Sequence, residues 1–154
     1  MKERIVENIK RLSLHDSILK KIDRIEDKLI LTVDWAKIED YTEKNIEEGL
    51  VLGNCRLTFY ELNNESLTID FRGTPGNENI APKEIEFDIK LFKEWLILDN
   101  KSVDENKYCL NGLIDYENKY GWLDWNFYFS KFELSWNNYI TWEEWRNGKI
   151  VKKE

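Results

Sequence analysis

Apolar and polar residues alternate with a period of two along most of this chain, and this alternation constrains the fold more than any other feature. It is clearest at residues 55–60 and 67–71, where the apolar positions are Cys55, Leu57, Phe59, Leu67, Ile69 and Phe71. Successive side chains of a β-strand point to opposite faces, so such segments are typical of antiparallel strands with one buried face. Strands do not alternate with long helices, which argues against a parallel sheet. We therefore expect an α+β fold, predominantly antiparallel β, arranged as one curved sheet or a two-layer β domain.

The length of the chain fits one domain. Its 154 residues are enough for one well-packed core, and no repeat, linker or low-complexity segment interrupts them. We expect residues 1–154 to form a single domain.

Turn residues divide the expected strands into hairpins. Strands near 18–25 and 29–35 flank the polar turn Glu26-Asp27-Lys28, and the strands at 55–60 and 67–71 flank Asn63-Asn64-Glu65. Each pair is expected to form a β-hairpin, and the second hairpin is the better defined. Elsewhere we expect a surface loop at 72–82, strands at 84–91, 95–98 and 108–115, a turn at 116–121, and at most one helical turn after the capping box at 102–105.

A long aromatic run follows, from Trp122 to Trp136. Its apolar residues fall in two phases, the first being Trp125, Phe127 and Phe129 and the second Phe132, Leu134 and Trp136. A single β-bulge near Ser130-Lys131 would bring both sets to the same side of one strand.

The two clearest helix predictions lie near the ends of the chain, and residues 37–49 are expected to form a loop or a short exposed helix that ends at Gly49. Residues 3–12 have apolar positions at helical spacing, so we expect an N-terminal amphipathic helix there. Thr141-Trp142-Glu143-Glu144 is a capping box and Gly148 can end the helix, which predicts a short C-terminal helix. Trp142 and Trp145, three residues apart, should lie side by side on it.

Charge and composition limit the classes of partner. Lys and Arg number 23 against 30 Asp and Glu, giving a net charge of −7, which argues against nucleic-acid binding and suits a basic partner. No apolar run approaches a membrane span and the N-terminus does not resemble a secretory signal. The two cysteines, Cys55 and Cys109, each lie in an alternating apolar run and are expected to be buried free thiols of a cytoplasmic protein.

No residue pattern indicates a catalytic, metal or cofactor site. His15 is the only histidine, the cysteines lack metal-ligand spacing, and no glycine-rich phosphate loop is present. We expect no cofactor and interpret His15-Asp16-Ser17 as a structural turn, in which Asp16 or Ser17 bonds local backbone N–H groups. Carboxylates are numerous, so a carboxylate-dependent hydrolase remains an alternative.

Two groups of residues are candidates for contact with a partner. One is the acidic stretch between 39 and 48, and the other is formed by tryptophans of the C-terminal part: Glu39, Asp40, Glu43, Glu47, Glu48, Trp136, Trp142 and Trp145. A solvated surface and core packing are the respective alternatives. Trp136-Asn137-Asn138-Tyr139 also suits a sugar-binding site or a tight turn, so a carbohydrate-binding β domain is a second alternative.

Leu14-His15-Asp16-Ser17, followed by a hairpin that ends in Asp34 and by Cys55-Arg56-Leu57-Thr58-Phe59, resembles a group of small bacterial domains that share an LHDS motif. Some of these domains are immunity proteins of polymorphic toxin systems. The resemblance covers the first half of the chain. It implies a cytoplasmic, non-catalytic protein that neutralises a toxin domain by protein–protein contact, and the acidic charge of the chain suits a basic toxin domain.

Overall fold

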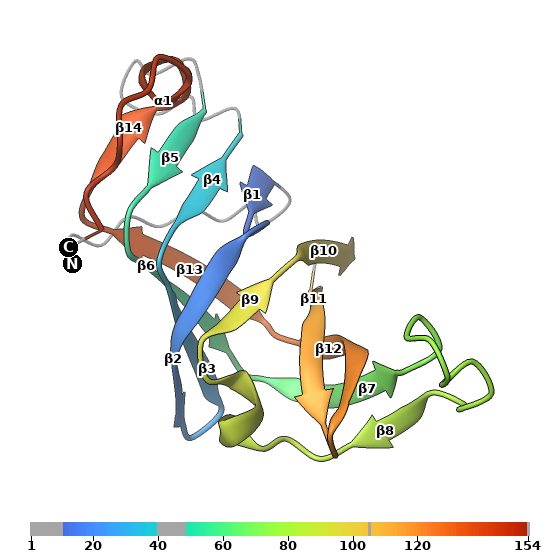
Figure 1. Ribbon diagram of the computed structural model, residues 1–154. Coiled ribbons are helices and arrows are strands. Elements are labelled where there is room, and N and C mark those ends of the chain that lie inside the picture. The colour runs from blue at the N-terminus through green and yellow to red at the C-terminus, as the bar shows by residue number, and fades with distance from the viewer. Residues whose placement is uncertain (1–10, 40–48, 105, 154) are drawn as a thin grey trace.

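The computed structural model describes residues 11–39, 49–104 and 106–153, which form three antiparallel β-sheets (Figure 1). The small sheet has the order β1 (Leu12–Ser13), β4 (Ala36–Ile38), β5 (Leu50–Leu52), β14 (Tyr139–Thr141). The first large sheet has the order β13 (Lys131–Trp136), β6 (Cys55–Tyr60), β3 (Lys28–Val33), β2 (Ser17–Ile25), β9 (Trp95–Ile97). The second large sheet has the order β10 (Asp99–Asp104), β11 (Lys107–Tyr116), β12 (Lys119–Tyr128), β7 (Asn63–Asp70), β8 (Lys83–Ile85). The expectation of a predominantly antiparallel β fold is confirmed.

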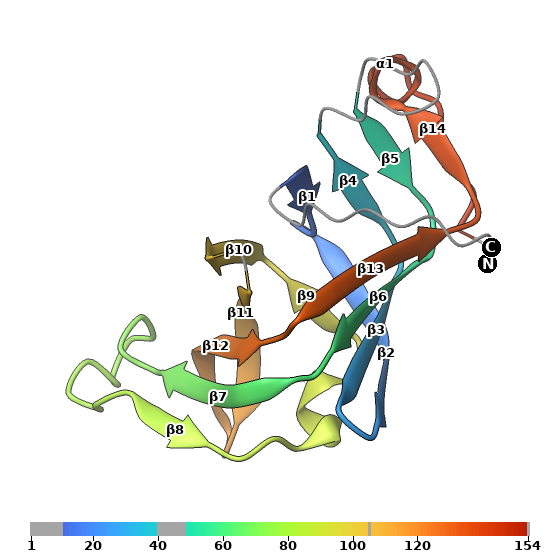
Figure 2. The same ribbon diagram turned by 180° about the vertical axis from the view of Figure 1, so that it is seen from behind.

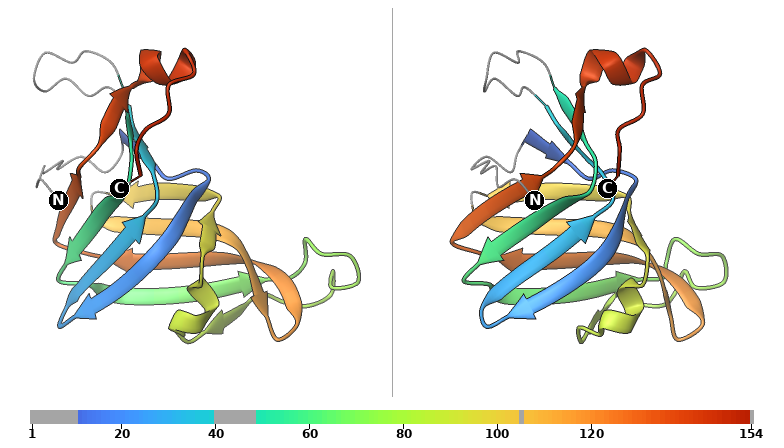
Figure 3. Two further views of the ribbon diagram at one scale, coloured as in Figure 1. Left: turned by 60° about the vertical axis from the view of Figure 1, so that its left-hand side comes forward. Right: turned by 90° about the vertical axis from the view of Figure 1, so that its left-hand side faces the viewer.

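The small sheet continues the first large sheet around a bend. Its strands stand in the order β1, β4, β5, β14, and the strands that each of them joins, β2, β3, β6 and β13, stand in the same order. The four connections are short, at residues 14–16, 34–35, 53–54 and 137–138. We call this line of connections the corner. Figure 3 shows the strands of the first large sheet side by side as one curved layer from which the small sheet rises.

The second large sheet packs against the first and closes one core. Phe59 of β6 contacts Phe127 of β12 edge to face, with 4.8 Å between ring centroids, and Tyr108 of β11 at 5.8 Å. The side chains of all three residues are fully buried. The alternation at Cys55, Leu57 and Phe59 therefore identified the buried face correctly.

The prediction that residues 55–60 and 67–71 form a hairpin is wrong. β6 pairs with β3 and β13, whereas β7 pairs with β12 and β8, so the chain passes from one large sheet to the other at Glu61-Leu62. Asn63-Asn64-Glu65, expected to be the turn, lies within β7. Alternation shows which face of a strand is buried, but it carries no information on the neighbouring strand.

The aromatic run 122–136 also divides between the two large sheets. β12 ends at Tyr128 and β13 begins at Lys131, and Figure 2 shows the chain passing directly from one to the other. The break lies where the change of phase placed it, but it is a change of sheet, not a bulge within one strand. Both aromatic sets reach the same core because the two sheets face each other.

Several local expectations are corrected. The strand expected at 84–91 is limited to β8 and is followed by a 3₁₀ helix, η3 (Ile89–Phe92), whose first turn is capped by Asp88 accepting from the Lys90 N–H. The first three residues of the capping box at 102–105 belong to β10, and Lys107 already begins β11. The turn expected at 116–121 is reduced to Glu117-Asn118, both with positive φ. The N-terminal helix falls on residues 1–10, outside the described part, and Leu12 belongs to β1.

Other local expectations are confirmed. β2 and β3 pair as the hairpin expected near 18–25 and 29–35. The helix α1 (Trp142–Arg146) begins at Thr141, whose Oγ1 accepts from the Glu144 N–H at 3.2 Å, and Gly148 follows it with φ 89°. The capping box thus predicted the start of this helix from local chemistry alone.

Candidate functional site

The LHDS segment forms part of the corner. Asp16 has φ 64°, its N–H donates to the Ile97 carbonyl at 2.9 Å, and the Ser17 N–H donates to the Leu14 carbonyl at 2.9 Å. These bonds confirm a turn between β1 and β2. Its backbone is tied both within the segment and to β9.

The side chain that supports this turn is Asp34, not Asp16. Asp34 is 4% exposed, and its Oδ1 accepts from the Ile18 N–H at 2.8 Å while its Oδ2 accepts from Lys153 Nζ at 2.7 Å. The Asp16 carboxylate is exposed and lies 3.5 Å from His15 Nε2. The expectation that Asp16 or Ser17 bonds local N–H groups is therefore corrected, because the Ser17 hydroxyl instead donates to the Trp35 carbonyl at 2.7 Å.

His15 does not form a nucleophilic triad with its neighbours. Its Nδ1 lies against the Leu98 carbonyl and its Nε2 faces Asp16. A triad requires a hydroxyl nucleophile on one ring nitrogen and an orienting carboxylate on the other. Among the described residues, the ring contacts of His15 include no hydroxyl.

Both cysteines are free and buried, as expected. Burial, with a smaller contribution from Asp34, raises the pKa of the Cys55 thiol well above its usual range. Burial and the Asp124 charge raise the pKa of Cys109 to about 11. Reactive thiols need a lowered pKa, so the environments of these two cysteines suit packing more than catalysis.

Metal-ligand clusters and membrane-spanning helices are both absent from the described residues. No cluster of three or more His, Cys, Asp or Glu side chains in 11–39, 49–104 and 106–153 could hold a metal ion. No described helix is both long enough and apolar enough to cross a membrane.

The C-terminal helix presents two stacked tryptophans beside the small sheet. The rings of Trp142 and Trp145 have centroids 4.8 Å apart and are inclined by 18°. Trp145 is 46% exposed. Lys37 of β4 places its Nζ 3.7 Å from the Trp142 ring centroid. The Trp142 side chain also packs against Val51 and Ile140 of the small sheet. The stack is therefore held from one side and open to solvent through Trp145.

Acidic residues adjoin this stack. Lys37 Nζ also lies 3.5 Å from the Glu39 carboxylate, and the Trp142 N–H donates to the Gly49 carbonyl at 2.8 Å. The described residues on either side of the acidic stretch are thus connected to α1. We call Glu39, Trp142, Glu143, Glu144 and Trp145 the tryptophan–glutamate patch.

The other residues predicted to contact a partner do not belong to this patch. Trp136 lies in β13 and is 1% exposed, so it packs in the core and offers no surface to a partner. Asn137-Asn138 is one connection of the corner, and the Asn138 carbonyl accepts from the Gly53 N–H of a second connection at 2.9 Å. Asp40, Glu43, Glu47 and Glu48 lie outside the described residues.

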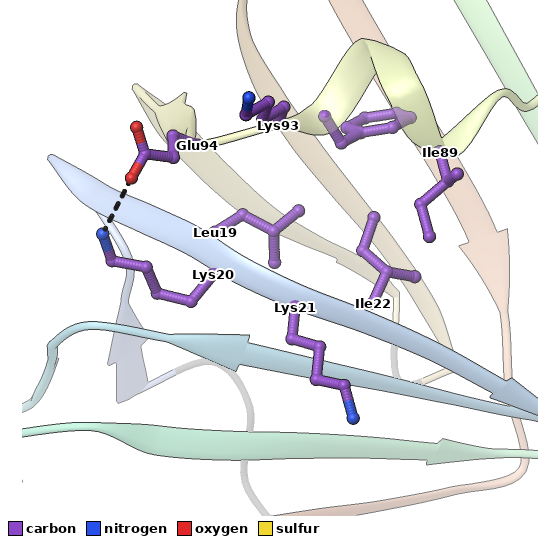
Figure 4. Close-up of a pocket in the computed structure, with 8 residues that line it drawn as sticks. Leu19, Lys20, Lys21, Ile22, Ile89, Lys93 and Glu94 are labelled. Atoms are coloured by element: carbon purple, nitrogen blue, oxygen red, sulfur yellow. Dashed lines mark ion pairs between the residues drawn. The ribbon is translucent and has the colours of Figure 1, made fainter.

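A groove of about 500 Å³, not expected from the sequence, lies between β2 and η3 (Figure 4). Apolar side chains of both elements line it, together with charged residues. The lining residues are Leu19, Lys20, Lys21, Ile22, Ile89, Phe92, Lys93 and Glu94. Glu94 is the single carboxylate among them, so the groove lacks the carboxylate pair that a glycosidase-type hydrolase needs.

Comparisons of the chain with protein-family models, curated proteins and solved structures found no match.

Proposed function

We propose that this chain is a non-catalytic binding protein, an immunity protein that neutralises a toxin domain by protein–protein contact through the tryptophan–glutamate patch. The observation that carries the proposal is the stacked Trp142–Trp145 pair, packed from one side and exposed on the other. Tryptophan is enriched among the residues that dominate binding energies at interfaces.

Pre-organisation strengthens this argument. Binding usually orders side chains at an entropic cost of about 0.5–1.5 kcal/mol each. Trp142 is already fixed by Lys37 and by Trp145, and α1 itself is fixed by its Thr141 cap. Docking on this pair would therefore order few additional groups.

Charge favours a basic partner. The sequence between 39 and 48 contributes five carboxylates against one lysine, and its first residue, Glu39, and the residue after it, Gly49, are connected to α1. Clustered charge of one sign accelerates association with an oppositely charged surface. The resemblance of the LHDS segment and the buried free thiols further support a cytoplasmic immunity protein.

The proposal predicts that a gene adjacent to this protein's gene encodes a toxin domain, and the test measures binding to, and protection from, that domain. We expect the unmodified chain to restore growth of cells that express that domain. Trp145→Ala should weaken binding by about 30-fold, as for a residue contributing about 2 kcal/mol at an interface.

Trp122→Ala is the matched control, because Trp122 is 36% exposed and lies on the second large sheet, away from α1. Its affinity should match that of the unmodified chain. Absence of protection, or equal loss from both variants when each is folded, contradicts the proposal.

A further inference from the structure

Strand β2 has an open edge over most of its length. It pairs with β3 from Leu19 to Ile25, but on its other side β9 covers only Ser17–Leu19. In the described part of the chain, no strand and no backbone hydrogen bond outside the β2–β3 pair engages residues 20–25. Unpaired N–H and C=O groups of such an edge can accept a further strand.

An apolar groove lies beside this edge. A register shift between Leu19 and Lys21 changes the phase of β2, so Leu19 and Ile22 are both buried although they are three residues apart. In Figure 4 both side chains point toward η3, which contributes Phe92 and Ile89. Ile89 is 57% exposed, so part of the groove wall is accessible apolar surface.

The charge of the groove is opposite to that of the whole chain. Two lysines, Lys20 and Lys93, face it against one glutamate, Glu94, in a protein of net charge −7. Lys20 pairs with Glu94 at 3.6 Å, and Lys21 points away from the groove and pairs with Asp23 at 2.9 Å. Lys93 has no carboxylate within ion-pair distance among the described residues, which leaves its charge available.

We propose that this groove binds an extended segment of a partner protein in which apolar and acidic residues alternate, added as a strand to the open edge of β2. Backbone bonds to residues 20–25 supply affinity in this mode, and alternate side chains supply specificity. One set of side chains would contact Ile22 and Ile89, while carboxylates of the segment would face Lys93 and Lys20. The site is separate from the tryptophan–glutamate patch and has the opposite charge, so it does not depend on the toxin-binding proposal.

The experiment uses a fluorescein-labelled synthetic peptide of about ten residues that alternates glutamate and valine, long enough to cover the edge. Fluorescence anisotropy with the full chain should show saturable binding that weakens as salt increases. Hydrogen exchange should slow at alternate backbone amides between Lys20 and Ile25 when the peptide is bound. A peptide with lysine in place of glutamate should bind at least tenfold more weakly.

Two variants and a modified peptide test the geometry. Lys93→Glu and Ile89→Ser should each weaken binding at least tenfold, whereas Ile150→Ser, which removes an 85% exposed isoleucine outside the groove, should not. N-methylation of alternate peptide nitrogens removes the donors of one strand edge and should abolish binding. No binding at about 1 mM peptide, binding that survives N-methylation, or equal effects of Ile89→Ser and Ile150→Ser would overturn the proposal.

Discussion

Replacement of Asp34 should destabilise the corner more than any change at Asp16. The Asp34 carboxylate is 4% exposed and accepts from the Ile18 N–H at 2.8 Å and from Lys153 Nζ at 2.7 Å. In Asp34→Ala the Ile18 N–H loses its acceptor at the turn between the small sheet and the first large sheet. A buried donor left without an acceptor costs about 1–3 kcal/mol.

The two bonds of Asp34 contribute unequally. The Lys153 side chain is 57% exposed, and ion pairs with such exposure stabilise by about 0–1 kcal/mol. The hydrogen bond from the Ile18 N–H therefore makes the larger contribution of Asp34 to stability. Asp34→Ala should lower the free energy of unfolding by about 2–3 kcal/mol. For a chain of this size that corresponds to a melting temperature lower by about 5–10 °C.

Two further variants separate the causes. Asp34→Asn retains an oxygen acceptor for Ile18 and loses only the charge, so it should cost about 1 kcal/mol or less. Asp16→Asn keeps a residue that tolerates the positive φ of 64° and should change the free energy of unfolding by less than about 0.5 kcal/mol.

Urea denaturation followed by tryptophan fluorescence measures all three variants. Unchanged stability of Asp34→Ala, or a loss in Asp16→Asn as large as that in Asp34→Ala, would refute this account of the corner.

Two other predictions concern packing and reactivity. Gly112→Ala should lower the free energy of unfolding by about 1–3 kcal/mol in urea denaturation. The added Cβ would lie 2.6 Å from the Leu96 carbonyl oxygen and 2.8 Å from the Trp95 ring. Gly73→Ala is the control, because a Cβ at Gly73 would meet no atom within 4 Å. With a pKa of about 11, only about a thousandth of Cys109 is thiolate at pH 8, so a chromogenic disulfide should modify it far more slowly in the folded chain than in urea. The folded-state rate should rise with pH toward 11, and equal rates in the folded and unfolded chains would contradict the burial of this thiol.

The LHDS motif and the Asp at the end of the following hairpin are neighbours in the structure. Asp34 of the β3–β4 connection bonds the backbone of Ile18, directly after the motif, and the Trp35 indole N–H donates to the Asp16 carbonyl at 2.9 Å. The motif therefore has a structural reason to occur with an Asp at that place. Its residues build the bend that carries the small sheet and α1, and so they position the tryptophan–glutamate patch indirectly.

The groove illustrates a site that local sequence patterns could not reveal. Its floor depends on the register shift in β2, which places Leu19 and Ile22 on one face. The alternation at 84–91 predicted a strand in place of η3, which forms the opposite wall. A signal was present in Asp88, whose side chain caps η3, but an Asp two residues before a lysine is too common to indicate a helix by itself.

The sequence by itself determined the buried face of several strands and the start of the C-terminal helix. Alternation with period two and helix-capping chemistry act between residues close in the chain, so Cys55, Leu57 and Phe59 were assigned to the core and Thr141 to the start of α1. Only the tertiary structure decided which strands pair and which carboxylate supports the turn. β6 and β7 separate into facing sheets, and Asp34 replaces Asp16, because both outcomes depend on contacts between segments distant in sequence, which local periodicity does not encode.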